Sequence, residues 1–590
     1  MTEICIKPGI VSRKRAIRIP ASLLETLALA AIASALSLLH KGFVFGIENN
    51  VFHLPIVAGL YDEPQYRDDV FIQSLRHFSS GVWLLLGNFE KHFGHTQALF
   101  LVLAYLSRLL CFVGFLCCAS LLGIVDRRDK IVFSLILCFI SFLDGDSYAG
   151  TGGLFLNYFT HSEIANGTVL LAIYFAAKSR FAAATLMCGV TFFINAFIAF
   201  WLVPLLAFVA ASLLRERKAT LGGIAWQALA GLLPCILLAI PVLGNIASNP
   251  EFGKPIDFDF VSYLQQYFAG HVLIGSISAL SMLGLAAVTL LGGVALSWFG
   301  AGARELQAAF CGAILLYAIG IAVPFFTSAP VVLNLHLLRS STIIHLLAGL
   351  ATAALATSWL RRDQEPAFLP GCLIVLSLSV GGLAFSFCIP IILSTHFTQP
   401  TQVIQATHRS GVFSRRVLGY LALAVVLGIV WPLSTWQNVK FNRLFAESIP
   451  EWTAVADWAR NSTPSTATFL VPSRPRATDT SEPAASDLAL SRTAIFEFIS
   501  HRRIWVDYKR GAAVMWMPSY YQTWRTRLTE VEALGSLDER LDYAGRHGID
   551  YVIDRCNPAL ALGEGEGVFR TERLCVFPAA RAPMTDTSSR

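Results

Sequence analysis

The stretch QALFLVLAYLSRLLCFVGFLCCASLLGI, residues 97–124, decides the class of the fold. Its 28 residues include one charged side chain, Arg108. A helix needs about 20 apolar residues to cross a hydrocarbon core of about 30 Å. This stretch is long enough to do so, and it indicates an integral membrane protein.

Similar apolar runs recur along the chain. Seven of them lie at about 21–45, 222–245, 271–299, 304–326, 338–360, 367–393 and 416–436. Shorter pieces lie near 130–143, 163–178 and 180–214, and the last is long enough for two short spans that meet near Trp201–Pro204. We therefore predict eleven to thirteen transmembrane helices.

The charged residues divide the chain into two parts. Residues 1–436 contain 46 of them, whereas residues 437–590 contain 38 in 154 positions, close to the share of about 25% in soluble proteins. With an apolar content of 55%, this division excludes a disordered chain and a disulfide-stapled miniprotein, and it argues against a soluble enzyme. We expect a basic N-terminus over 1–20, an α-helical polytopic transmembrane domain over 21–436 and a soluble α/β domain over 437–590.

Short basic clusters between the apolar runs predict the orientation. If the spans alternate, one cytoplasmic face receives the clusters at 13–18, 127–130, 178–180, 215–218, 304 and 361–362. The net charge of +6 is thereby explained without nucleic acid. The opposite face receives the loops 46–96, 144–162, 246–270 and 327–337.

The arginines at 409, 415 and 416 conflict with this scheme, because 367–393 reads as one crossing that ends outside. Either a re-entrant or second short crossing lies in 381–400, or the last loop breaks the rule. We favour a C-terminal domain outside, because Cys556 and Cys575 lie on two candidate strands and could form a disulfide there. The expected location is a bacterial inner membrane, with this domain in the periplasm.

The C-terminal part alternates helical and β-rich segments. Helical patterns occur at 450–464, 519–534 and 537–547, and short β-rich runs at 466–472, 503–508, 549–554 and 570–577. Residues 473–494, rich in Ser, Thr, Pro and Ala, read as a loop. A Gly-rich phosphate loop and a nucleophile elbow are both missing from this sequence. A cap or acceptor-docking domain is expected, and the chemistry is expected elsewhere.

The first outer loop, FGIENNVFHLPIVAGLYDEPQYRDDVFIQSLRHF (residues 45–78), is unusually long and polar. Asp68 and Asp69 precede Phe71, Ile72, Leu75 and Phe78, whose helical spacing suggests an amphipathic helix on the membrane surface. The acidic pair would then lie at the boundary between lipid and water. The alternative is that one of the two aspartates caps a helix.

The second outer loop carries another acidic pair, Asp144 and Asp146, followed by His161 and Glu163. Asp-Gly-Asp could ligate a divalent cation through hard oxygens. It could equally form a glycine turn with Asx hydrogen bonds, which we favour. His161 and Glu163 begin a span, where polar residues are costly unless they are paired or used.

Two arginines lie in apolar surroundings and are candidate functional residues. Arg339 falls near the outer end of its span, with His336 one turn before it. A guanidinium suits bidentate phosphate binding, and the alternative for Arg339 is snorkelling to the interface. Arg108 lies in mid-span, where we favour a structural ion pair.

Together these residues suit a reaction between a lipid-linked anionic donor and a polar acceptor. In sugar transfer from a polyprenyl phosphate, an arginine or a metal stabilises the leaving phosphate. An aspartate takes the proton from the acceptor hydroxyl, and attack opposite the phosphate inverts the anomeric centre.

The layout resembles the GT-C superfamily of membrane glycosyltransferases, which includes protein O-mannosyltransferases, aminoarabinose transferases and oligosaccharyltransferases. The shared features are a cytoplasmic N-terminus, one span, a long acidic outer loop, many further spans and a soluble C-terminal domain. The chain also looks like a group of bacterial polytopic proteins with a similar first loop. A WWD-type sequence is missing from the C-terminal part, which argues against an oligosaccharyltransferase. The first loop also differs from the Asp-Glu pattern of O-mannosyltransferases.

This resemblance implies roles for particular residues. The first-loop base or metal ligand would be Asp68 or Asp69 in YRDDVF, ahead of Glu48 and Asp62. Asp144 and Asp146 would match the second-loop acids, and Arg339 the phosphate-binding residue. Further candidate substrate-binding residues are His336, His161 and Glu163.

The expected partners are a polyprenyl-phosphate-linked sugar, membrane lipid, and an acceptor glycan, lipid or protein. No cofactor is required by the sequence, and a divalent cation is left open. Two other functions compete: a transporter or lipid-linked-sugar flippase without chemistry, and a polysaccharide polymerase or ligase. The spans contain almost no acids and no internal repeat, which disfavours a transporter.

Overall fold

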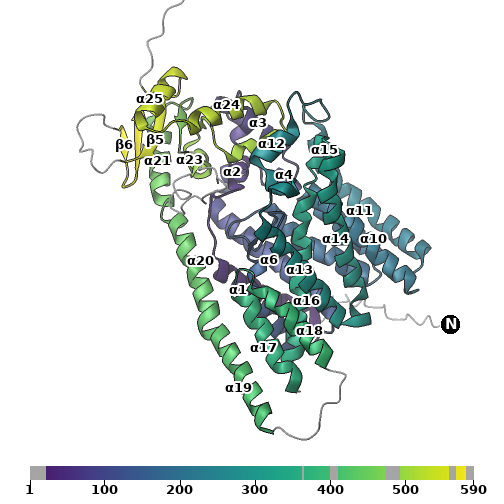
Figure 1. Ribbon diagram of the computed structural model, residues 1–590. Coiled ribbons are helices and arrows are strands. Elements are labelled where there is room, and N and C mark those ends of the chain that lie inside the picture. The colour runs from purple at the N-terminus through teal and green to yellow at the C-terminus, as the bar shows by residue number, and fades with distance from the viewer. Residues whose placement is uncertain (1–20, 362–364, 399–408, 473–491, 557–566, 580–590) are drawn as a thin grey trace, which may run out of the picture.

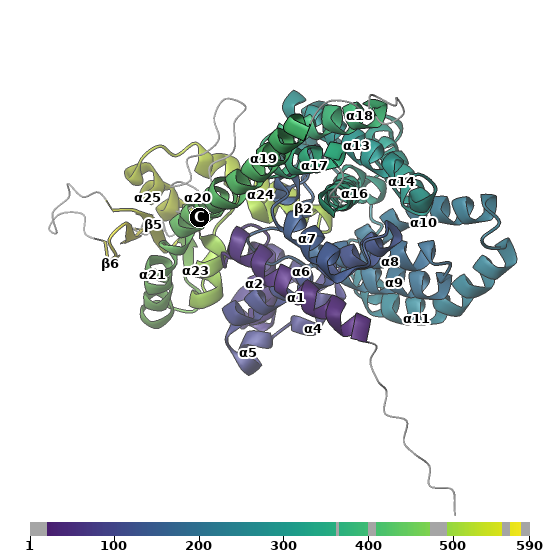
Figure 2. The same ribbon diagram turned by 90° about the horizontal axis from the view of Figure 1, so that it is seen from below.

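A computed structural model describes residues 21–361, 365–398, 409–472, 492–556 and 567–579. Figure 1 shows a bundle of helices with a small domain of helices and strands at one end. Seen from below in Figure 2, this C-terminal domain lies to one side of the bundle.

Among the described residues, eight helical segments are long and apolar enough to cross a membrane. Their helices are α1 (Ala21–Lys41), α6 (Thr96–Leu121), α10 (Ala196–Arg215), α11 (Leu221–Ala247), α13 (Ala279–Trp298), α14 (Arg304–Phe326), α16 (Ser341–Arg361), and α19 (Arg409–Val425) continued by α20 (Trp431–Ala446). Many of their outward leucines, valines and phenylalanines are exposed, as lipid-facing side chains are. The chain is therefore an integral membrane protein.

Shorter helices complete the bundle: α7 (Arg127–Cys138), α8 (His161–Ala177) and α9 (Phe181–Ile194). The predicted junction of two short spans near Trp201–Pro204 is wrong. The break lies at Asn195, whose extended backbone ends α9 and whose side chain accepts hydrogen bonds from the amides of Phe197 and Ile198. This N-cap starts α10, and Pro204 is accommodated inside that helix.

The apolar run 367–393 forms a helical hairpin, so the prediction of one crossing there is wrong. Helix α17 (Glu365–Ser379) and helix α18 (Cys388–Thr398) are joined through Gly381 and Gly382, both with positive φ. The Cys388 thiol lies 3.8 Å from the Ile374 carbonyl oxygen, across the turn. The chain thus reverses direction within 381–400, as one of the two alternatives proposed. Helix α19 then begins at the end of the bundle far from the C-terminal domain (Figure 1).

Helices α19 and α20 form one rod that leads to the C-terminal domain. A π-helical turn at Val426–Val430 joins them. The rod runs along the outside of the bundle and continues to Ala446 (Figure 1). The domain boundary predicted at residue 437 therefore falls inside α20, because amphipathic helix continues beyond the apolar segment.

Several basic clusters meet acids at the end of the bundle opposite the C-terminal domain. Lys130 pairs with Glu25 at 3.3 Å, and Arg361 with Asp129 at 2.7 Å. Arg304 likewise pairs with Glu216 at 2.6 Å. These ion pairs connect basic clusters that the sequence predicted to share one face of the membrane.

The C-terminal domain is built on a five-stranded sheet with the order β4-β3-β5-β7-β6. Strand β3 is parallel to β4 and β5, whereas β7 is antiparallel to β5 and β6. The strands are β3 (Thr468–Leu470), β4 (Arg503–Ile504), β5 (Tyr551–Arg555), β6 (Phe569–Arg570) and β7 (Leu574–Pro578), and the helices are α21 (Ile449–Ser462), α23 (Thr493–Ser500), α24 (Tyr520–Glu532) and α25 (Leu537–Arg546). Cys556 and Cys575 form a disulfide.

This domain docks on the first outer loop, which folds into α2 (Asn50–Ala58), α3 (Val70–Ser74), α4 (Gly81–Leu86) and α5 (Phe89–Phe93). The expected membrane-surface helix is wrong. Phe71 and Ile72 are fully buried, and the Arg510 guanidinium lies 4.5 Å from the Phe71 ring centre. Their apolar face packs against the domain instead of lipid. Helix α12 (Phe260–Tyr267) adds to this contact, since the Tyr263 hydroxyl donates to the Gly511 carbonyl at 2.8 Å.

A buried ion pair lies at this interface. Arg510 and Glu497 approach to 2.6 Å with side-chain exposures of 2% and 0%. Breaking such a pair leaves an uncompensated buried charge, which costs about 3–5 kcal/mol, whereas an apolar replacement of both partners costs much less.

We predict that Glu497→Ala lowers the Tm of the full-length protein in detergent by several degrees, and that Glu497→Leu combined with Arg510→Met recovers most of the loss. Scanning fluorimetry measures both. Glu447→Ala, which removes the exposed Arg443–Glu447 pair, serves as the control and should shift Tm little. Equal shifts for Glu497→Ala and the control would contradict a stabilising role for the buried pair.

Candidate functional site

A cavity of about 560 Å³ lies between the membrane-spanning bundle and the C-terminal domain. It is lined by the end of α1, the first and second loops, the loop that contains His271, the turn before α16, the end of α20 and the C-terminal domain. Phe441 and Phe445 of α20 give one apolar wall. The remaining lining combines apolar residues with several charged and polar side chains.

Four charged side chains enter this cavity from four separate segments. Glu48 comes from the first loop, Asp146 from the second loop, Arg339 from the turn before α16, and Lys509 from the C-terminal domain. The Lys509 ammonium lies 3.4 Å from the Glu48 carboxylate. Lys41, Arg492 and Asp507 also line the cavity, so acids and cations share one space, which is a common property of catalytic sites.

The local backbone explains how the first acid reaches the cavity. Glu48 has a φ of 50°, the left-handed conformation that non-glycine residues adopt rarely. This residue turns the chain between α1 and α2. The turn directs the chain across the outer end of the bundle, where the C-terminal domain can supply Lys509.

Two glycines bring the second acid into place. A Cβ on Gly150 would lie 2.2 Å from the Leu338 carbonyl oxygen, and one on Gly152 would lie 1.9 Å from the Thr342 hydroxyl. Only glycine allows the second loop to lie this closely on the start of α16. The loop forms a small ladder of β1 (Gly145–Asp146) and β2 (Gly153–Leu154), which carries Asp146 toward Arg339.

Arg339 lies in a short 3₁₀ turn, Leu337–Ser340, that precedes α16. Within the described part of the chain, its guanidinium takes part in neither a hydrogen bond nor an ion pair with another residue, although it lines the cavity. A guanidinium has five donors and binds phosphate bidentately. Arg339 is therefore available to an anionic ligand.

Burial changes the acidity of the groups around Arg339. The Asp146 side chain is exposed to the cavity, and desolvation by the surrounding protein raises the pKa of its carboxyl while the Arg339 charge opposes the rise. Desolvation likewise raises the pKa of the Tyr158 phenol well above its usual value. Tyr158 is therefore a neutral donor, and Asp146 is a more basic carboxylate than an aspartate with the ordinary pKa.

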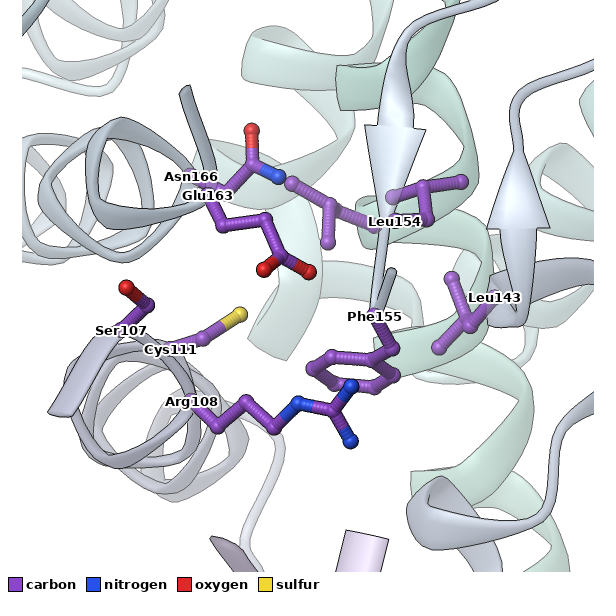
Figure 3. Close-up of a pocket in the computed structure, with 9 residues that line it drawn as sticks. Ser107, Arg108, Cys111, Leu143, Leu154, Phe155, Glu163 and Asn166 are labelled. Carbon is purple, nitrogen blue, oxygen red and sulfur yellow. The ribbon is translucent and has the colours of Figure 1, made fainter. Parts of the chain in front are cut away.

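A buried clamp holds the cavity wall that contains Tyr158. The Glu163 carboxylate accepts from the Leu156 amide at 2.7 Å, and the Arg108 guanidinium donates to the Leu156 carbonyl at 2.6 Å. Figure 3 shows both side chains at a small internal void, with Arg108 beneath the Phe155 ring. Arg108 also donates to Ser37 at 3.0 Å. Both residues are structural, and they position the second loop.

A smaller chamber of about 160 Å³ adjoins the cavity and shares Arg339, Lys509 and His271 with it. His336 and His161 line this chamber. The structure therefore groups the sequence candidates as follows. Glu48, Asp146 and Arg339 share the cavity, whereas His161 and His336 lie next to it.

The acids of the first-loop turn lie elsewhere. Asp69 caps α3 by accepting from the Ile72 amide at 3.0 Å, as the capping alternative proposed. Asp62 pairs with Arg76 at 2.8 Å on the surface. Asp68 is exposed. None of these three lines the described cavity, so the expectation that Asp68 or Asp69 shares a site with Arg339 is wrong.

The two acids of the second loop, Asp144 and Asp146, have different surroundings. Asp144 forms an ion pair with Lys41 at 2.9 Å, whereas Asp146 faces the cavity. Within the described residues, no group of three or more His, Cys, Asp or Glu side chains could hold a metal ion.

Several cavity residues escaped the sequence analysis, notably Lys509, Asp507 and His271. Lys509 and Asp507 lie in DYKR, which overlaps the end of the predicted β-rich run 503–508, so a charged tetrapeptide at a strand end was an available signal. The C-terminal domain, where no chemistry was expected, lines this cavity and adds charged side chains to it.

Comparison with known proteins adds one finding. A family described as "Domain of unknown function (DUF6798)" matches residues 450–531. The matched segment runs from α21 into α24 and contains the cavity residues Asp507 and Lys509. No curated protein matches the sequence.

The clamp yields a direct prediction. Glu163→Leu removes the acceptor of the Leu156 amide, so hydrogen exchange in the segment 153–160 should accelerate about tenfold. Mass spectrometry of the full-length protein measures this exchange. Glu163→Gln retains an acceptor oxygen and should exchange nearly as slowly as the wild type. Unchanged exchange in Glu163→Leu would refute the clamp.

Proposed function

We propose that this protein is an inverting glycosyltransferase that moves a sugar from a polyprenyl-phosphate donor to an acceptor at the outer face of the membrane. One observation carries the proposal: Glu48, Asp146, Arg339 and Lys509 converge on a single cavity at the outer end of the bundle. The layout of the chain, which resembles GT-C transferases, is consistent with it.

Arg339 and Lys509 would bind the phosphate of the donor. Arg339 has no partner among the described residues, and Lys509 is 3.4 Å from Glu48. Both side chains lie at the junction of the cavity and the smaller chamber. As the bond between the anomeric carbon and the phosphate oxygen breaks, negative charge grows on the phosphate, and fixed cations stabilise it.

Asp146 would act as the general base. It would accept the proton of the acceptor hydroxyl while that oxygen bonds to the anomeric carbon opposite the phosphate. Asp146 lacks an ion pair within the described residues, whereas Glu48 is engaged by Lys509. Glu48 would hold Lys509 in position, and Phe441 and Phe445 would offer an apolar surface to the first isoprene units.

The outer face is proposed from charge. The basic clusters gather at the end of the bundle that carries the Lys130–Glu25 and Arg361–Asp129 pairs, and such clusters favour the cytoplasm. The disulfide-bonded C-terminal domain, which lines the cavity, lies at the other end (Figure 1). This arrangement would place the site outside a bacterial inner membrane, where disulfides persist.

The activity test uses membrane vesicles that contain the full-length protein and a panel of polyprenyl-phosphate sugars labelled in the sugar. We predict that Asp146→Asn lowers sugar transfer by about 10²–10⁴-fold, and that Arg339→Gln lowers it by about 10²-fold or more. Asp68→Asn removes an exposed acid of the same outer face and should retain wild-type transfer. Full transfer by Asp146→Asn would overturn the assignment of the base.

The pH dependence follows from the same residue. A general base must be ionised, and desolvation raises the pKa of Asp146. The rate should therefore fall as the pH drops through this raised pKa, at a higher pH than an aspartate with the ordinary pKa would give. Profiles of kcat/KM between about pH 4 and 8 test this. The acid limb should be lost from the residual activity of Asp146→Asn, and a limb that persists there would contradict the role.

A further inference from the structure

Tyr158 of the second loop lies between two residues that are anchored to other parts of the protein. The Asn157 side chain donates to the side-chain oxygen of Asn442 in α20 at 2.7 Å. The Phe159 carbonyl accepts from the side chain of Asn50, the first residue of α2, at 3.2 Å. The backbone around Tyr158 is thus bonded to α20 on one side and to α2 on the other. These bonds determine where its ring enters the cavity.

The hydroxyl of Tyr158 has no hydrogen-bond partner among the described residues. Tyr158 lines the cavity, and its side chain is half-buried. The fully buried side-chain atoms that lack a partner in the described part of the chain do not include its oxygen, so a ligand in the cavity can reach it. A tyrosine hydroxyl in a protein interior usually finds a partner. The hydroxyl of Tyr158 instead keeps its donor and its acceptor capacity for a ligand.

Most charged side chains of the cavity are already engaged by the protein. Ion pairs or hydrogen bonds with other residues occupy Lys41, Glu48, Arg492, Asp507 and Lys509. In contrast, Asp146, Tyr158 and Arg339 form neither an ion pair nor a hydrogen bond within the described residues. These three side chains are therefore available to a ligand, and they comprise one acid, one neutral hydroxyl and one cation.

The charges around Tyr158 define what its hydroxyl can do. Desolvation, together with the charges of Glu48 and Asp146, raises the pKa of the phenol well above its usual value, and the Arg339 charge opposes the rise. Tyr158 therefore keeps its proton at physiological pH and cannot serve as a base. A neutral O–H near a guanidinium adds a hydrogen-bond donor without adding charge, and a phosphate oxygen accepts from both.

We propose that Tyr158 is a third phosphate-binding residue of the cavity, and that its hydroxyl donates a hydrogen bond to the phosphate oxygen that leaves the anomeric carbon. This inference rests on the proposed function, since it adds a catalytic residue to the same reaction. As the carbon–oxygen bond breaks, its electron pair stays on the phosphate oxygen, and the hydrogen bond strengthens as charge accumulates there. The proton stays on the phenol, and Asp146 remains the base.

Tyr158→Phe keeps the ring and removes the hydroxyl. In the vesicle assay it should lower kcat for sugar transfer about 10²-fold and change the KM for the acceptor little, because the lost hydrogen bond is strongest in the transition state. The matched control is Tyr148→Phe, in the same loop. The Tyr148 hydroxyl donates to the Gly382 carbonyl at 3.3 Å, away from the cavity lining, so this variant should transfer sugar like the wild type.

Hydrogen exchange separates a chemical role of Tyr158 from a structural one. The segment 153–160 is held by its backbone and by Asn157, so its exchange in Tyr158→Phe should equal that of the wild type. Faster exchange throughout this segment would assign Tyr158 a structural role and overturn the inference.

A spectroscopic measurement tests the phosphate contact without turnover. 3-Fluorotyrosine replaces tyrosine at position 158 of the full-length protein in nanodiscs, and its fluorine resonance is followed by NMR. We expect the resonance to shift when polyprenyl phosphate is added and to stay in place with polyprenol, which has the same chain but no phosphate. Arg339→Gln should reduce the shift, because Arg339 and Tyr158 would bind the same phosphate.

The outcomes distinguish this inference from the proposed function. Wild-type kcat in Tyr158→Phe, or equal fluorine shifts with polyprenyl phosphate and polyprenol, would overturn the role of Tyr158. Transfer that still depended on Asp146 and Arg339 would in that case leave the proposed function standing. A phosphate-dependent shift in a protein that transfers no sugar from the donor panel would support the phosphate contact and contradict the proposed function.

Discussion

The contact between Glu48 and Lys509 joins the two halves of this protein across one cavity. Glu48 follows the first span, and Lys509 belongs to a domain more than four hundred residues later. Their pairing depends on the docking of the C-terminal domain onto the first loop, where Arg510 covers Phe71. Without that docking the cavity would lose one wall, which includes Lys509, Arg492 and Asp507. The domain is therefore part of the candidate site, and it covers the cavity at one end of the bundle.

Charged side chains are scarce in the membrane-spanning helices, because ionisable groups are costly inside a bilayer. Inside a bilayer, an ionisable side chain must have an ion-pair or hydrogen-bond partner, or it must serve the function of the protein. Arg108 and Glu163 are used structurally, since they hold the carbonyl and the amide of Leu156. Arg339 is the contrasting case, because it lines the cavity without a protein partner among the described residues. The guanidinium of Arg108 has hydrogen-bond partners in the protein, whereas that of Arg339 has none among the described residues. For this reason we assign a structural role to Arg108 and propose a ligand-binding role for Arg339.

The sequence predicted the class of the fold well and the site only in part. Apolar runs such as 97–124 located the long helices because hydrophobic length is a local property. Gly381 and Gly382 turned one predicted span into a hairpin, and Asn195 moved another boundary, since short local signals override an apolar average. Asp69 looked catalytic but caps a helix. The convergence of Glu48, Asp146 and Lys509 depends on tertiary contacts that no local pattern contains.

The account depends on a phosphate-binding role for the unpaired arginine at the mouth of the chamber. The most direct measurement is an electron cryo-microscopy structure of the full-length protein in nanodiscs with polyprenyl phosphate. We expect headgroup density within hydrogen-bond distance of Arg339 and Lys509, with the isoprenoid chain leaving past Phe441. A headgroup bound elsewhere, or an empty cavity at saturating lipid, would contradict the account.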